Sequence, residues 1–217
     1  EQQFAEPVGP AVPRVSGLSP ERIALGLFFV CLGTALNWLA YTQWHAVVSV
    51  YMRGLGYSLA AYSGLWTING LVIVLGQPLV SATVRRWFAG LRAQIAVGSL
   101  LFALAFILIS RWTGYQGFVI GMVVLTLGEM LVLPGLPAAA ASLAAPGVLG
   151  LYQGILGGAA CAGRMAGPIL GGALYDRLTP PGVLAGAAMV CAAAAGAYWA
   201  YGWAVKKGRT LGKSDKT

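Results

Sequence analysis

Six long stretches with at most one charged residue each constrain the fold of this chain more than any other feature. They cover residues 24–51, 58–84, 91–110, 115–143, 148–175 and 182–205. About 20 apolar residues in a helix cross the ~30 Å hydrocarbon layer of a bilayer. A backbone in lipid must satisfy its own hydrogen bonds, and these stretches lack the alternating pattern of barrel strands. The sequence therefore predicts an all-α membrane protein with six transmembrane helices.

The composition excludes several other classes of protein. Hydrophobic residues make up 58% of the chain and charged residues 9%, against about 25% charged in a soluble domain. The three cysteines are too few for a disulfide scaffold, and all lie in apolar stretches, so we interpret them as buried small residues without a redox or metal role. The net charge is +8, but the basic residues are scattered singly, so we expect a lipid bilayer and no nucleic acid as partner.

The remaining segments predict the topology. Residues 1–22 contain four prolines among polar residues and predict a cytoplasmic linker, residues 23–205 the six-helix bundle, and residues 206–217 a basic cytoplasmic tail. The chain begins with Glu1 and not with Met, so we expect it to be part of a longer protein. Ten Lys and Arg residues fall on the side of both termini and three on the opposite side, so the positive-inside rule places both termini in the cytoplasm. The ten are Arg14, Arg22, Arg85, Arg86, Arg92, Lys206, Lys207, Arg209, Lys213 and Lys216, and the three are Arg53, Arg111 and Arg177.

Polar residues near the middle of a membrane helix are costly in lipid, so they indicate which helices face a cavity. The first stretch carries a polar stripe spaced by three and four residues, and the second carries a comparable one, whereas the third and sixth are nearly apolar. Two polar-faced helices and one apolar helix, repeated twice, predict a three-plus-three repeat with the apolar helices on the lipid side. The residues we expect to line a substrate cavity are Asn37, Tyr41, Trp44, His45, Trp66 and Asn69.

The aromatic members of this set allow two interpretations. They can form a wall for apolar or cationic ligands, or they can be interface anchors and interhelical packing. His45 lies in the outer third of its helix beside Trp44, and we expect it to be a hydrogen-bonded interior histidine rather than a pH switch.

Glu129 is at the centre of the fourth stretch, and Arg164 is close to the centre of the fifth. An isolated carboxylate at the membrane midplane is desolvated, which favours its protonated form, as a proton carrier requires. Adjacent antiparallel helices would place the two residues within about 4 Å in depth, since a helix rises 1.5 Å per residue. Three hypotheses are open: Glu129 exchanges a proton for Arg164 or a cationic substrate, the two form a permanent ion pair, or they face different cavities.

Several motifs resemble the carboxy-terminal six-helix half of a major facilitator superfamily transporter. They include the 53–56 turn Arg-Gly-Leu-Gly, the 66–70 run, the Gln77-Pro78 pair and residues 126–130. The clearest motif has the spacing G-x8-G-x3-G-P-x2-G-G, which is similar to the antiporter motif of the family. Its residues are Gly154, Gly163, Gly167, Pro168, Gly171 and Gly172. Small residues allow close helix approach and proline bends a helix, so helix packing and exporter function both explain it.

The resemblance implies a secondary active transporter of the bacterial cytoplasmic (inner) membrane, similar to proton-coupled multidrug exporters. Its substrates would be protons and an amphipathic or cationic small molecule, moved by alternating access. A facilitator-type importer of sugars or other small solutes, or a non-transporting membrane scaffold, are the alternatives. We expect neither an enzyme nor a cofactor, because the chain has one His and the stretches contain no acid besides Glu129. Six helices supply one wall of such a transporter, so we expect a missing amino-terminal six-helix half, on the same polypeptide or a separate chain, in preference to a second copy of this one.

Overall fold

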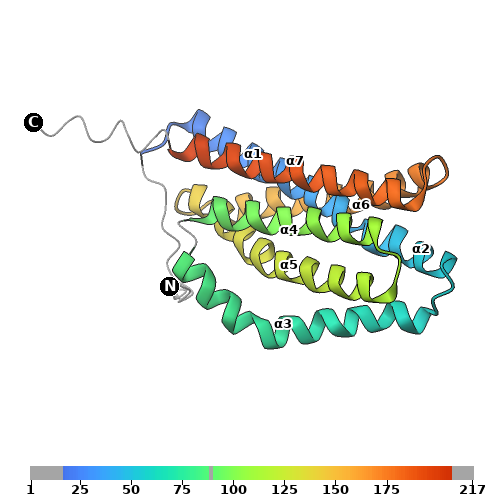
Figure 1. Ribbon diagram of the computed structural model, residues 1–217. Coiled ribbons are helices and arrows are strands. Elements are labelled where there is room, and N and C mark those ends of the chain that lie inside the picture. Colours follow the sequence, from blue (N-terminus) through green and yellow to red (C-terminus); the bar gives the residue numbers. More distant parts are fainter. Residues whose placement is uncertain (1–16, 88–89, 207–217) are drawn as a thin grey trace, which may run out of the picture.

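The computed structural model describes residues 17–87 and 90–206, which fold into long helices joined by short connections (Figure 1). The first predicted span consists of α1 (Pro20–Tyr41), a π-helical turn η1 (Trp44–Val48) and α2 (Ser49–Gly54), and five further helices follow. These are α3 (Leu59–Trp87), α4 (Leu91–Arg111), α5 (Tyr115–Leu143), α6 (Leu149–Tyr175) and α7 (Pro180–Lys206). No strand occurs in the described ranges, so the predicted all-α fold is confirmed.

Five segments of the described chain are long and apolar enough, by length and composition, to cross a membrane. They are Pro20–Gly54, Leu59–Val84, Leu91–Arg111, Tyr115–Leu143 and Pro180–Val205. The remaining predicted span is α6, which is 27 residues long. Its many glycines and Arg164 make it less hydropathic than its neighbours, although its length suffices for a membrane crossing.

The helices pack in a pattern that repeats after three spans. α4 packs along α5 and α7, α1 packs along α7 and α6, and α3 packs mainly on α5. Exchanging the first three spans (α1 with η1 and α2, then α3, then α4) for the last three (α5, α6, α7) turns the α4–α5 contact into the α1–α7 contact and the α1–α6 contact into the α3–α5 contact, and leaves the α4–α7 contact unchanged. The predicted three-plus-three repeat is therefore present, with α1 and α5 as equivalent helices that also touch each other.

The main contacts join the helices in the order α6, α1, α7, α4, α5, α3, so α3 and α6 lie at the two ends of an arc. Figure 1 shows α3 at one edge of the bundle. α4 and α7 pack together on the far side, where both expose large apolar side chains. Examples are Val97, Leu100, Leu104, Ile107, Met189 and Trp199. Lipid requires an apolar outer surface. We therefore interpret α4 and α7 as lipid-facing helices that support the bundle.

Glycines bring α6 against α1. An added Cβ at Gly163 would overlap the backbone of Ala35, and one at Gly171 would overlap the Gln43 side chain. At Gly167 it would overlap the Thr42 hydroxyl and lie 2.7 Å from the carbonyl oxygen of Leu39. By contrast, Gly154 and Gly172 have open space around them, and Pro168 is exposed. Three of the motif's glycines thus act in helix packing, where only a hydrogen fits.

Helix interruptions shape the walls of the bundle. α3 is bent (Figure 1) and contains Pro78, while α5 contains Pro134 and Pro137 beyond its midpoint. Each proline removes a backbone donor and clashes with the preceding turn. Two residues after the end of α2, Gly56 has a φ of +89°, and the amide of Tyr57 donates to the carbonyl of Met52 at 3.0 Å. This Schellman ending favours glycine because only glycine adopts the left-handed conformation without strain.

The predicted linker and tail fall mostly outside the described residues. Helix α1 begins at Pro20, so the last three residues of the predicted 1–22 linker are helical, and residues 1–16 are outside the description. α7 extends to Lys206, and residues 207–217 of the predicted tail are outside it.

Candidate substrate and proton site

Glu129 is the central residue of α5, and its carboxylate accepts hydrogen bonds from two neighbouring helices. The Tyr41 hydroxyl of α1 donates to Oε1 at 3.3 Å, and the Asn69 amide of α3 donates to Oε2 at 2.9 Å. Both donors are neutral, and the carboxylate forms no ion pair with any residue of the described chain. Glu129 of α5 is therefore bonded to both α1 and α3.

The amide of Asn69 has a second acceptor on α5. Asn69 Nδ2 also donates to Thr126 Oγ1 at 2.9 Å, and the Thr126 hydroxyl in turn donates to the carbonyl of Met122 at 2.7 Å. An amide nitrogen has two hydrogens, so it can satisfy both acceptors at once. Asn69 is 8% exposed, and these bonds fix α3 against α5 at the level of Glu129.

Aromatic rings extend from Tyr41 in both directions along α1. The ring of Trp38 meets Tyr41 edge-on at 5.3 Å between centroids, and the ring of His45 lies 6.0 Å from Tyr41. His45 stacks on Trp66 of α3 at 4.5 Å with only 10° between the planes. Tyr62 packs edge-on against Trp66 at 6.5 Å. The strip formed by Trp38, Tyr41, His45 and Trp66 spans the inner face from α1 to α3.

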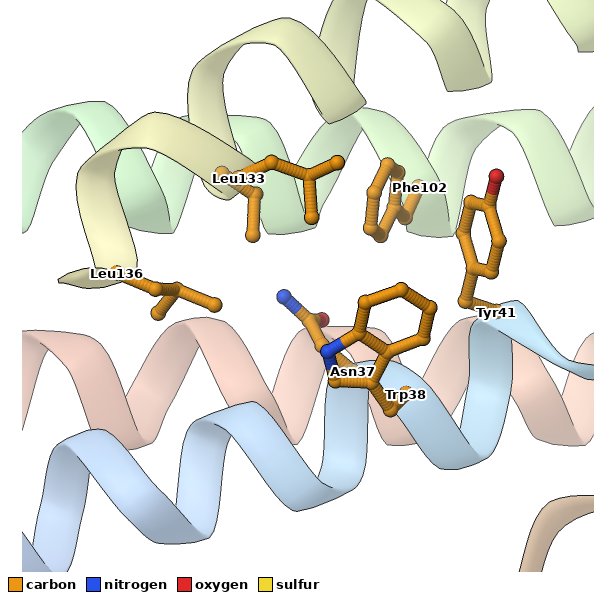
Figure 2. A pocket seen from close by; sticks show the side chains of 7 residues that line it. Asn37, Trp38, Tyr41, Phe102, Leu133 and Leu136 are labelled. Carbon is orange, nitrogen blue, oxygen red and sulfur yellow. The ribbon is translucent and has the colours of Figure 1, made fainter. Parts of the chain in front are cut away.

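A small pocket opens beside this strip, between α1 and α5 (Figure 2). In Figure 2 the side chains of Asn37 and Trp38 project from α1 toward Leu133 and Leu136 of α5. Phe102 of α4 closes the pocket behind Tyr41. The surface exposed in the pocket is entirely apolar, and the pocket is a shallow indentation that can take no more than a small apolar group.

Arg164 lies on the inner face of α6, next to this pocket. Its guanidinium carbon is 4.3 Å from the centre of the Trp38 ring, and Nη2 is 3.9 Å from the sulfur of Cys161. No carboxylate of the described chain pairs with it, and the residue is exposed. Glu129 and Arg164 are therefore not bonded to each other in this structure; Arg164 contacts Trp38, Glu129 is bonded to Tyr41, and the Trp38 and Tyr41 rings touch each other.

Two of the predicted lining residues have other roles in the structure. Trp44 is fully buried and packs against Phe106 of α4, whereas the neighbouring His45 stacks on Trp66 of α3. Asn37 borders the pocket, but its amide is held by Tyr198 at 3.2 Å and by the Ser99 hydroxyl at 2.7 Å. Tyr41, His45, Trp66 and Asn69 lie together as described above.

His45 differs from the interior histidine that the sequence suggested. Its side chain is exposed, and its ring makes no hydrogen bond within residues 17–87 and 90–206 but stacks on Trp66. The histidine thus contributes a flat aromatic surface that connects the first span to α3.

Three residues of the site were not predicted from the sequence. The Trp38 ring contacts the guanidinium of Arg164 and lines the pocket. The Thr126 hydroxyl accepts a hydrogen bond from the Asn69 amide, which also bonds to Glu129. The Ser99 hydroxyl of α4 bonds to Asn37 and, at 2.8 Å, to the carbonyl of Cys191 on α7. Thr126 precedes Glu129 by three residues, and Trp38 precedes Tyr41 by three, so helical periodicity gave a signal for both. No group of three His, Cys, Asp or Glu side chains in the described ranges is arranged to hold a metal ion.

Residues 23–215 match the family model of the Major Facilitator Superfamily. A relative from Bacillus subtilis (strain 168), an uncharacterized MFS-type transporter named YttB, is 46% identical over 144 residues, which cover 66% of this chain and 36% of the relative. A solved structure of a POT family transporter, in complex with a thioalcohol-conjugated peptide, matches with a TM-score of 0.71 at 17% identity.

That structural match covers 88% of this chain and 43% of the other chain, and at such low identity it shows the fold alone. The chain thus spans less than half the length of both relatives. Because the family model covers nearly all of it, the chain belongs to the Major Facilitator Superfamily and corresponds to one six-helix half of that fold.

Proposed function

We propose that this chain forms the carboxy-terminal half of a proton-coupled secondary transporter that exports amphipathic or cationic small molecules. The observation that carries the proposal is the carboxyl group of Glu129, which sits at the centre of α5 with only neutral hydrogen-bond donors around it. A carboxylate without a fixed cation has no permanent compensation of its charge. A proton or a cationic group of the substrate can provide that compensation in turn.

The geometry supports a switch between the two states. The deprotonated carboxylate accepts bonds from both Tyr41 and Asn69. When Oε1 is protonated, it donates to the Tyr41 oxygen instead, because a phenol is both donor and acceptor. The proton state of Glu129 thereby changes a contact between α1 and α5, which line the pocket together with Phe102 of α4.

Alternating access requires a second bundle that rocks against this one around a shared site. The inner face of α1, α3, α5 and α6 carries the pocket and the aromatic strip and forms one wall. We infer that an amino-terminal six-helix half, on the same polypeptide or a separate chain, forms the other. We place the protein in the bacterial cytoplasmic membrane with both ends of this chain in the cytoplasm, from the ten-to-three distribution of Lys and Arg.

The pocket lining favours amphipathic molecules over sugars. A sugar site needs several free donors and acceptors, since an unpaired hydroxyl in a buried site is costly. Here the Asn37 amide is already bonded to Tyr198 and Ser99, the Tyr41 hydroxyl is bonded to Glu129, and the surface exposed in the pocket is apolar.

Transport in proteoliposomes with an imposed pH gradient tests the proposal. The protein at its natural length should move lipophilic cations, and not sugars, in exchange for protons, and Glu129→Gln should abolish this proton-driven transport while the protein still folds. Glu21→Gln is the matched control, because Glu21 lies in the first turn of α1, away from the site. Undiminished pH-driven transport by Glu129→Gln would refute the proton-coupling role.

A further inference from the structure

The guanidinium group of Arg164 has almost none of its hydrogen-bonding capacity in use. It rests over the Trp38 ring at 4.3 Å, and its single polar contact in the described chain is the Cys161 sulfur at 3.9 Å. A guanidinium carries five N–H donors and a charge that is never lost. A permanent cation among membrane helices marks a functional site by default, because lipid does not solvate it.

The charge of opposite sign contacts the same aromatic pair. Trp38 contacts Arg164, Tyr41 contacts Glu129, and the two rings touch at a centroid distance of 5.3 Å. The two charges thus contact neighbouring rings and form no ion pair with each other.

The apolar pocket is continuous with these same two rings. Trp38 and Tyr41 both line it, together with Phe102, Leu133 and Leu136 (Figure 2). The inner face thus carries Glu129, which can bind a cation, an aromatic and aliphatic surface, and Arg164, which can bind an anion.

We infer that the substrate is an amphipathic zwitterion, whose carboxylate pairs with Arg164, whose apolar body lies against Trp38, Tyr41 and the pocket, and whose ammonium group approaches Glu129. This inference rests on the proposed function and specifies its substrate class. Arg164 suits the carboxylate because a guanidinium can donate two parallel N–H bonds to it. When the substrate's ammonium group binds, the proton of the Glu129 carboxyl group leaves to the aqueous phase. The net charge at Glu129 is therefore zero both with the proton bound and with the ammonium bound. Arg164 holds the substrate's anionic group through the exchange.

Three probes with the same ring system test this assignment. They are 3-(2-naphthyl)alanine, which is a zwitterion, 2-(2-naphthyl)ethylamine, which lacks the carboxylate, and 3-(2-naphthyl)propanoic acid, which lacks the amine. We expect isothermal titration calorimetry on the protein at its natural length to show the zwitterion bound at least about tenfold more tightly than the amine and the acid, since each missing charge removes one charge-assisted contact.

The variants assign each charge to its residue. Arg164→Gln should remove the preference for the zwitterion over the amine, whereas Glu129→Gln should remove the preference for the zwitterion over the acid. Arg177→Gln is the matched control, because Arg177 is an exposed arginine that follows α6 and lies outside the site. If the other half of the transporter neutralises Arg164, then Arg164→Gln will keep the full preference for the carboxylate, and the inference is wrong.

Cys161 provides a measurement that needs no variant. Its sulfur is exposed and lies beside the guanidinium of Arg164. Naphthylalanine bound at Arg164 should slow the alkylation of Cys161 by N-ethylmaleimide, followed by peptide mass spectrometry, more strongly than naphthylethylamine does at the same occupancy. Equal protection by the two compounds, or no binding of naphthylalanine, overturns the inference. If lipophilic cations are nevertheless exported against protons, the proposed function stands without it.

Discussion

The amide of Asn69 on α3 donates 2.9 Å hydrogen bonds to both Glu129 Oε2 and Thr126 Oγ1 on α5. Because α3 packs mainly on α5, this amide is a principal polar attachment of the helix at the end of the arc. The bond to a carboxylate contributes about 1.5–3 kcal/mol, more than a bond between neutral groups.

Asn69→Leu should therefore destabilise the protein by about 1.5–3 kcal/mol, since it leaves acceptors on Glu129 and Thr126 unpaired inside the bundle. Thermal unfolding in detergent measures the effect. Gln77→Leu is the control on the same helix, because within the described residues the Gln77 amide bonds only to Ser81 one turn later, at 3.3 Å. Equal melting temperatures for the two variants would show that the Asn69 bonds add no stability.

Gly167→Ala should disrupt the contact between α1 and α6. The new methyl group would overlap the Thr42 hydroxyl and approach the Leu39 carbonyl, and α6 would move away from Gln43, whose amide donates to the Gly167 carbonyl at 2.8 Å. Overpacking of this kind costs about 1–3 kcal/mol, which we expect as a lower melting temperature and poorer expression.

Gly172→Ala is the matched control from the same motif, since nothing lies within 4 Å of a Cβ added there. It should be neutral or slightly stabilising, because alanine is a better helix former than glycine. A destabilised Gly172→Ala would indicate that this part of the motif contacts something outside the described chain.

The sequence predicted the helices and the central position of Glu129, because both follow from the length of the apolar stretches and from the cost of a charge in lipid. It did not predict the partner of Arg164. That partner depends on the rotation of α6, which Gly163, Gly167 and Gly171 set by facing α1. With 100° per residue, this orientation puts Arg164 beside Trp38 of α1 and not opposite Glu129. Such a rotation is a property of packed helices and cannot be read from one helix alone.

The sequence also did not predict the environment of Trp44. The three-and-four spacing from Asn37 to His45 predicts a single polar face, but a π-helical turn begins at Trp44 and shifts the positions that follow it. Only the packed structure, with Trp44 against Phe106 of α4 and His45 on Trp66 of α3, shows that the two side chains diverge.

His45→Phe should retain both stability and transport, whereas His45→Ala should lose about 0.5–1.5 kcal/mol, the contribution of an aromatic pair. The reason is that His45 acts through its ring face on Trp66, with planes 10° apart, and its nitrogens bond to nothing in the described chain. Melting temperatures and pH-driven transport check both variants. A Phe variant that folds but does not transport would show that the imidazole itself takes part in transport.

Trp44→Phe should leave transport intact, in contrast to Trp38→Phe. The Trp44 ring is fully buried against Phe106, and its Nε1 finds no acceptor in the part of the chain that the structure describes. Phenylalanine keeps the aromatic contact and removes that unsatisfied donor, whose burial costs about 1–3 kcal/mol. This gain partly offsets the stability lost through the smaller side-chain volume.

Trp38→Phe, in turn, weakens the cation–π contact with Arg164, because indole binds cations more strongly than benzene does, and it enlarges the pocket. Export rates of one lipophilic cation, compared at equal protein levels, should fall severalfold for Trp38→Phe alone. A comparable fall for Trp44→Phe would place Trp44 in the substrate path after all.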